Sequence, residues 1–190
     1  ALKQCDAEYF VLLNSDAEPG NADWLHELVK TAESHSDFAA AQPKILDYKR
    51  NGKFEYAGAA GGCIDTFGFP FCKGRIFGNV ETDKGQYDES TPIFWASGAA
   101  LFIRRDAWEK VNGLDPDFFA HMEEIDLCWR IQSENLGIYS CPQATVYHMG
   151  GATLSNQNPR KTFLNFRNSL IMLHKNLPES ILKKRILQRK

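Results

Sequence analysis

The chain has 190 residues, of which 43% are hydrophobic, and this length and composition suit one domain with a core of its own. It carries 22 basic and 24 acidic residues, a formal charge of -2, so no overall positive field favours nucleic acid as a partner. Its five cysteines are odd in number and lack C-x-x-C spacing, which argues against a disulfide framework or a zinc site and favours a reducing cytoplasm.

The first predicted strand, residues 9–13, is a continuous apolar run of β-favouring residues that ends abruptly at Asn14 and Asp16. Such a run is typical of a buried parallel strand. Ligands of open α/β sheets bind at the carboxyl ends of the strands, so we expect Asp16 to lie at the functional edge of the sheet. The alternative is that residues 14–20 form an ordinary polar turn.

The next elements form the framework. Residues 24–32 have the apolar spacing of an amphipathic helix, and residues 38–41 and 45–46 predict two further short pieces of sheet. Residues 58–85 are rich in glycine and aromatic side chains, and we expect a long irregular loop that contacts a ligand. No glycine-rich phosphate-binding motif occurs.

A second apolar stretch, residues 94–103, has small residues at its centre and predicts a buried strand at residues 100–103. A short helix at residues 106–111 should follow and end at Asn112-Gly113.

The helix predicted to open near Glu123 has three carboxylates in its first turns. Spacings of three and four place Glu123, Asp126 and Arg130 on one side, whereas Glu124 points elsewhere and could face a cleft. The acids could simply complement the positive end of the helix dipole. They could equally raise one another's pKa, which would give a general base that works near neutral pH. The local pattern favours neither interpretation.

The last part of the chain predicts short strands at residues 137–140 and 144–147, followed by His148 at a strand end. A helix should run from Phe163 towards Leu177. We divide the chain into a main domain, residues 1–176, and a basic amphipathic tail, residues 177–190. The tail could touch an anionic membrane surface, although a solvated helix end is the simpler interpretation.

Several segments together resemble the family 2 glycosyltransferases with the GT-A fold, in their rhamnosyltransferase-like branch. Residues 13–18 are similar to the family's D-x-D region, residues 95–105 to its acceptor-side strand, and residues 123–130 to its E-D-x-D-L-x-x-R motif. Residues 146–151 are similar to its late histidine element, and Arg167-Asn168 to a further recurrent pair. The resemblance implies an α/β fold, the C-terminal portion of a Rossmann-like, mixed-sheet GT-A domain.

On the donor side, the resemblance implies that Asp16 and His148 bind Mg²⁺ or Mn²⁺. Asn14, Asp16 and Arg130 would contact the diphosphate of a nucleotide-sugar donor. A hard cation held by oxygen ligands would offset the charge of the departing diphosphate. The chain departs from the family pattern at Asn14, where the first acid of the D-x-D would stand.

On the acceptor side, the resemblance implies that Glu124, with support from Glu123, is the general base on the acceptor hydroxyl. Direct attack by that hydroxyl would invert the sugar's anomeric centre. Trp95, Gly98 and Asp126 would contact the acceptor. Here the departure is Glu124 itself, because the family usually has the shorter aspartate.

The resemblance therefore implies an inverting hexosyltransferase of cell-surface polysaccharide synthesis. It would transfer a sugar, rhamnose as the first expectation, to a glycan or lipid-linked acceptor, in the cytoplasm or peripherally at the inner membrane face. The family's N-terminal nucleotide-binding part does not precede residue 9, so we expect this piece alone to be weakly active or inactive. The alternatives are a glycoside hydrolase that uses Glu123 and Glu124, or a carbohydrate-binding module without catalysis.

Overall fold

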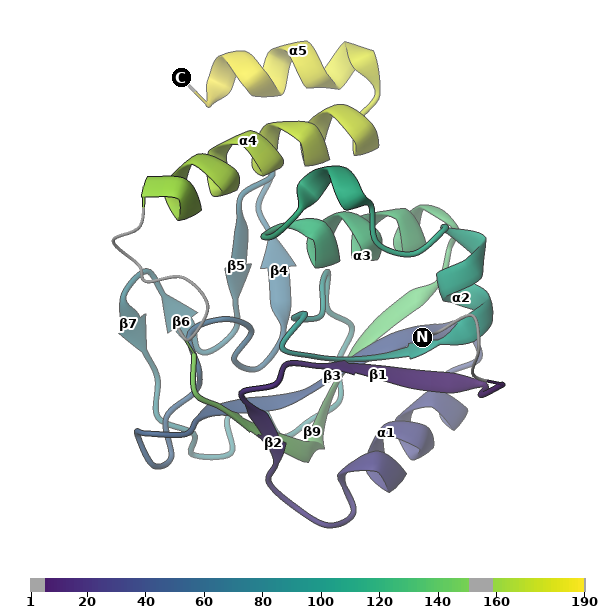
Figure 1. Cartoon of the computed structure of the whole chain (residues 1–190), viewed down its shortest axis with the longest axis vertical. Coiled ribbons are helices and arrows are strands. Elements are labelled where there is room, and N and C mark those ends of the chain that lie inside the picture. Colours follow the sequence, from purple (N-terminus) through teal and green to yellow (C-terminus); the bar gives the residue numbers. More distant parts are fainter. Residues whose placement is uncertain (1–5, 151–158, 190) are drawn as a thin grey trace.

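The computed structural model describes residues 6–150 and 159–189, which form two sheets and their covering helices (Figure 1). The central sheet contains β1 (Tyr9–Leu13), β8 (Ala100–Arg104), β3 (Phe38–Asp47), β9 (Gly137–His148) and β2 (Ala17–Pro19), in that order. A smaller sheet contains β4 (Gly62–Ile64), β5 (Pro70–Cys72), β6 (Arg75–Ile76) and β7 (Asn79–Val80). The helices are α1 (Trp24–Glu33), α2 (Arg105–Lys110), the 3-10 turn η2 (Pro116–Phe118), α3 (Glu123–Ser133), α4 (Pro159–Asn176) and α5 (Glu179–Gln188).

The central sheet is mixed, and its strand directions decide where the site forms. β8 pairs antiparallel with both β1 and β3, whereas β3 and β9 are parallel. β1 therefore runs in the same direction as β3 and β9, and all three carboxyl ends lie at one edge of the sheet. The expectation of a buried parallel strand was wrong for β1, which is half-buried and has an antiparallel neighbour. The edge expected for Asp16 was nevertheless correct, because direction and not pairing sets it.

Alternating side chains of the central sheet enter two hydrophobic layers. Leu101 and Ile103 of β8 face the cluster that includes Leu127 of α3, whereas Phe102 faces the cluster that includes Leu28 of α1. Helices thus cover both faces of the sheet (Figure 1), and the α/β prediction is confirmed.

Two predicted pairs of short strands are single long strands, β3 and β9. Their mutual register shifts between Pro43 and Lys44, because Pro43 lies opposite Cys141 and Lys44 opposite Thr145. An irregularity of this kind accommodates a proline inside a sheet. Each predicted pair of short strands is therefore continuous through this irregularity.

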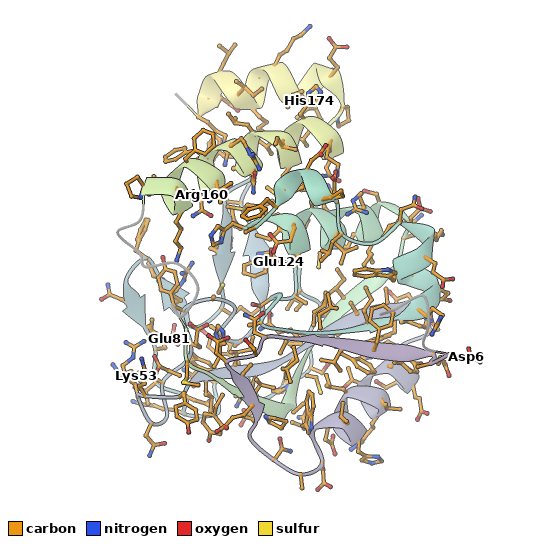
Figure 2. All side chains as sticks on the ribbon, viewed as in Figure 1. Asp6, Lys53, Glu81, Glu124, Arg160 and His174 are labelled. Atoms are coloured by element: carbon orange, nitrogen blue, oxygen red, sulfur yellow. The ribbon has the colours of Figure 1, made fainter. Side chains whose placement is uncertain are left out.

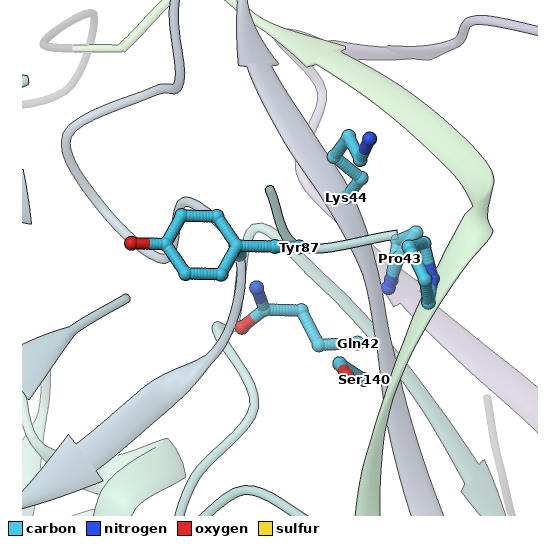
Figure 3. Close-up of a pocket in the computed structure, with 7 residues that line it drawn as sticks. Gln42, Pro43, Lys44, Tyr87 and Ser140 are labelled. Carbon is cyan, nitrogen blue, oxygen red and sulfur yellow. The ribbon is translucent and has the colours of Figure 1, made fainter. Parts of the chain in front are cut away.

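The glycine-rich residues 58–85 form the small sheet β4–β7, so the prediction of a purely irregular loop was wrong. The segment that follows is attached to β3 through Lys44, whose ammonium lies 2.8 Å from Asp83 and 2.5 Å from Asp88. Lys44 and Tyr87 line one small hollow beside β3 (Figure 3). These two ion pairs hold residues 83–88 to β3.

The predicted short helix is α2, one residue earlier than expected. The tail forms α5, which lies beside α4 and buries Leu182 (Figure 1). In the described part of the chain, no helix is both long and apolar enough to span a bilayer. Gly151, the last residue of the segment similar to the late histidine element, lies outside the described residues.

Candidate active site

The carboxyl edge of the central sheet meets the start of α3 at the turn that precedes β8. The backbone N–H of Asn14 donates to the carbonyl of Ala99 at 3.0 Å, which places the end of β1 against this turn. Gly98 lies against Glu124, since a Cβ on Gly98 would be 3.9 Å from the Cβ of Glu124. Figure 2 shows Glu124 between the helices and the central sheet. One turn therefore separates the strand-end residues from the carboxylates of α3.

His148 is the centre of the strand-end group. Its Nε2 lies 3.2 Å from Oδ1 of Asp16 and 3.4 Å from the amide nitrogen of Asn14. Its Nδ1 lies 3.4 Å from Oε2 of Glu55. The three residues predicted for the donor side at residues 14, 16 and 148 are thus in contact, although they come from opposite ends of the chain.

Glu55 was not identified from the sequence. It follows β3, its side chain is 6% exposed, and its carboxylate accepts a hydrogen bond from the N–H of Ala57 at 2.5 Å. The Glu55 carboxylate holds the pKa of His148 above its usual range, against the opposing effect of burial. Only the fold brings Glu55 to His148, and no local motif marks it in the sequence.

The turn before β8 is fixed by a second set of hydrogen bonds. The N–H of Ser97 donates to the side chain of Gln42 at 2.8 Å, and the Ser97 hydroxyl donates to the carbonyl of Ala57 at 2.6 Å. Because Ala57 also donates to Glu55, the turn and the His148 group share one network. This network holds the position of Gly98 relative to the strand ends.

Glu123 and Glu124 begin α3, and in each of them one carboxyl oxygen, Oε2, is buried and has no hydrogen-bond partner among the described residues. Burial, and then the neighbouring Glu123, raise the pKa of Glu124 to about 8, while burial also raises the pKa of Glu123. Nearby N–H groups, including that of Gly98, counter the rise only in part. Glu124 is therefore a carboxylate that can exchange a proton near neutral pH.

The backbone before α3 is strained. Phe119, His121 and Met122 have φ values of 61°, 68° and 71°, a region that non-glycine residues seldom adopt. The side-chain amide of Asn168 on α4 donates to the carbonyls of Phe118, Ala120 and His121 at 2.7–2.9 Å. Strain of this kind persists where surrounding contacts enforce it, and it gathers at functional sites. The Arg167-Asn168 pair thus helps to aim the start of α3.

Asp126 and Arg130 are structural, which corrects the acceptor and diphosphate roles expected for them. Asp126 is fully buried and accepts hydrogen bonds from Arg130, Lys175 and Asn176 at 2.8, 2.9 and 2.8 Å. Arg130 also donates to the backbone carbonyls of Val111 and Gly113. Asp126 has no exposed surface for a ligand, and the Arg130 guanidinium is committed to protein acceptors.

Trp95 does not form the acceptor platform that we expected. It is 6% exposed, and its indole N–H donates to the carbonyl of Cys63 at 2.8 Å. Gly62 lies directly on the ring, because a Cβ at that glycine would come within 2.1 Å of it. Trp95 is therefore a core residue that holds the small sheet to the turn before β8.

Comparison with known proteins gives partial relatives. No protein-family model matches the chain. The low-salt glycan biosynthesis hexosyltransferase Agl10 of Haloferax volcanii is 24% identical over 95% of this chain and 55% of its own length. The N-acetylglucosaminyl-diphospho-decaprenol L-rhamnosyltransferase of Mycobacterium tuberculosis (strain CDC 1551 / Oshkosh) is 40% identical over 30% of this chain and 19% of its own. The chain is therefore similar to a glycan-biosynthesis hexosyltransferase and to an L-rhamnosyltransferase.

The fold agrees with this similarity. A crystal structure of GalNAc-T7 with UDP, GalNAc and Mn²⁺ matches 88% of this chain and 31% of its own, with a TM-score of 0.58 and 14% identity. This likeness shows the GT-A fold. The chain spans about half the length of the archaeal relative and less of the mycobacterial one.

Proposed function

We propose that this chain forms the metal-binding and acceptor-binding part of an inverting glycosyltransferase that uses a nucleotide-diphosphate sugar. The observation that carries the proposal is the unpaired, buried carboxylate of Glu124 next to the Asp16–His148 group, with only the turn at Gly98 between them. A base and a polar donor site on the two sides of one turn suit transfer from a bound donor to a hydroxyl nucleophile.

On the donor side, Asp16 and His148 would hold Mg²⁺ or Mn²⁺. No three His, Cys, Asp or Glu side chains among the described residues are grouped to hold a metal ion. Two protein ligands still fit, because Mg²⁺ in nucleotide sites is bound by one or two carboxylates, substrate phosphates and waters. The Asp16 oxygen and the His148 nitrogen are 3.2 Å apart, close enough to bind one ion side by side. The cation would offset the charge of the departing diphosphate.

On the acceptor side, Glu124 removes the proton from the attacking hydroxyl, and attack from the face opposite the diphosphate inverts the anomeric centre. Burial raises the pKa of Glu124 most, and repulsion from the Glu123 carboxylate raises it further. Gly98 leaves room at the carboxylate, since its missing side chain would stand over Glu124. Asn14 lies beside His148 and can donate an amide hydrogen to a donor phosphate.

The substrates follow from the relatives. The mycobacterial relative is named as an L-rhamnosyltransferase for a decaprenol-linked acceptor, so we propose rhamnose as the sugar and a lipid-linked glycan as the acceptor. We therefore propose a role in cell-surface polysaccharide synthesis at the inner face of the membrane. Domain residues 1–176 would carry the site and residues 177–190 a peripheral tail. Because the relatives are longer than this chain, we propose that full turnover needs the parts outside it.

Binding of a nucleoside diphosphate with and without Mn²⁺ tests the proposal. In the protein that contains this chain, we expect calorimetry to detect binding only with Mn²⁺, and Asp16→Asn to weaken it about tenfold or more, because a carboxylate ligand is lost. The matched control is Asp23→Asn, which changes an exposed acid that does not contact His148. Binding that ignores both Mn²⁺ and Asp16→Asn would instead favour a glycoside hydrolase or a carbohydrate-binding module.

A further inference from the structure

An apolar groove lies beside the helix that carries the candidate base. It has a volume of about 450 Å³, and its walls come from α4, α5, the residues around the start of β5, and Met122. They include Phe69, Met122, Phe166, Leu170, Ile186 and Arg189. This volume falls within the range of small-molecule sites, roughly 300–1,000 Å³. Phe166 is 72% exposed, so the groove presents aromatic surface whose burial by a ligand would be favourable.

The groove reaches the residue that precedes the first turn of α3. Met122 contributes to the wall and is the residue directly before Glu123 on α3. The strained backbone at Met122 turns the chain from the groove into the first turn of the helix. A molecule in the groove that contacts Met122 therefore lies beside the residue that precedes Glu123.

The two helices that form most of the groove are basic, and one of their cations lines it. Residues 159–189 contain eight lysines and arginines and one acidic residue, Glu179. Arg189 lies within the wall, stacks over Phe69 at 3.8 Å and donates to the hydroxyl of Ser169 at 2.8 Å. Its Nε is buried and has no hydrogen-bond partner among the described residues. Apolar walls that include the Arg189 guanidinium suit an amphiphile that combines a hydrocarbon chain with an anionic head.

We propose that this groove binds the hydrocarbon chain of a phosphate-linked lipid acceptor, with the head of the lipid directed to Glu124. The inference rests on the proposed function and adds the location of the acceptor's lipid part. The groove would set the acceptor's orientation, and α4 and α5 would belong to the acceptor site. A second copy of the chain and a flat bilayer surface are the other occupants, and the test separates them.

Normal alkyl monophosphates of increasing chain length, kept below micelle formation, are the probes, with inorganic phosphate as the headgroup alone. We expect affinity to rise about fourfold for each buried methylene until the groove is full. Leu170→Glu should weaken binding of the longer probes about tenfold or more, because a charge would enter the apolar wall. The matched controls, Phe163→Glu and Leu187→Glu, change exposed apolar residues of α4 and α5 that do not line the groove.

Thermal unfolding of each variant confirms that it is folded before binding is compared. Affinity that ignores chain length, or equal losses in Leu170→Glu and both controls, would overturn the proposal. Binding to anionic phospholipid vesicles but to no alkyl phosphate, with equal losses of vesicle binding in Leu170→Glu and both controls, would assign the groove to a bilayer surface. Self-association that Leu170→Glu abolishes, again without probe binding, would assign it to a second copy. No nucleotide is present in these measurements, so their failure is distinct from a failure of Mn²⁺-dependent nucleotide binding.

Discussion

Two sets of carboxylates at the start of α3 share one helix but differ in their partners. Asp126 is fully buried and accepts hydrogen bonds from three side chains on α3 and α4. Glu123 and Glu124 each keep a buried oxygen without a partner among the described residues. Both sets are thus buried. They differ in whether hydrogen-bond donors contact their buried carboxylate oxygens. An unsatisfied buried carboxylate is costly and therefore marks a site, whereas a satisfied one marks a brace.

The brace also explains how the site withstands its own repulsion. Lys175 bridges Asp126 to Asp115, which lies just before η2, and the hydrogen bond from Lys175 holds the pKa of Asp115 below its usual range. Arg130 joins the same carboxylate to the carbonyls of the loop after α2. The start of α3 is therefore anchored on its far side while Glu124 faces the turn before β8. Removing the Glu124 carboxylate should lower activity without lowering stability. Removing the Asp126 carboxylate should lower stability.

Glu124→Gln should give the largest effect. In the protein that contains this chain, we expect turnover to fall roughly 10²- to 10⁴-fold, the usual contribution of a general base. The free energy of unfolding should be unchanged or higher. The substitution removes an acid whose ionisation the folded state opposes. Initial rates of sugar transfer and urea unfolding measure the two effects. The control is Glu134→Gln, at the exposed end of the same helix, which should leave the rate unchanged.

The pH dependence of this effect has a definite sign. The base acts as a carboxylate, and its pKa is about 8, so turnover should rise with pH up to about that value. Protons shared with Glu123 make this an apparent pKa of the pair. Folding has the opposite trend. A pKa raised from 4.5 to about 8 favours the folded state below pH 4.5, and that stabilisation is lost as the pH rises through 8. Glu124→Gln should flatten both profiles, and unchanged profiles would argue against Glu124 as the base.

Asp126→Ala should have the second largest effect, on folding. Removing one partner of a buried ion pair leaves the other charges uncompensated, which costs about 3–5 kcal/mol. We expect that loss in the free energy of unfolding, measured with urea on this chain. Asp106→Ala, which removes an exposed carboxylate paired to Arg104, is the control and should cost about 1 kcal/mol or less. A loss for Asp126→Ala as small as that of the control would show that Asp126 is not the brace.

The sequence predicted much of this arrangement because the relevant signals are local. Helical spacing predicted the start of α3 near Glu123 and placed Asp126 and Arg130 on one side of it. The apolar run that ends at Asn14 predicted that Asp16 lies at the carboxyl edge of the sheet. The contacts of Lys175 and Asn176 with Asp126 could not be predicted, because α4 reaches α3 only through the tertiary fold.

The wrong predictions have the same physical origin. Trp95 and Arg130 look like ligand-binding residues in sequence, but distant backbone groups satisfy their polar atoms. The strands of residues 58–85 are only two or three residues long, too short to show an alternating pattern. Glu55 stands alone between aromatic residues and acquires a role only when β9 brings His148 to it. A single sequence does not show which polar side chains form hydrogen bonds with residues that are distant along the chain.

Glu55→Gln should give the smallest of these effects and tests whether the same distinction applies on the donor side. The Glu55 carboxylate lies 3.4 Å from Nδ1 of His148, on the ring edge opposite Asp16. Such a partner orients a metal-binding histidine, and its loss typically weakens metal affinity by about 10- to 100-fold. We expect that decrease in Mn²⁺ affinity, measured by titration with a nucleoside diphosphate present. Glu18→Gln, on the exposed strand β2, is the control and should bind as the unchanged chain does. Equal affinity in both variants would mean that Glu55 only stabilises the turn at Ala57, whereas a selective loss would make it the residue that aims His148.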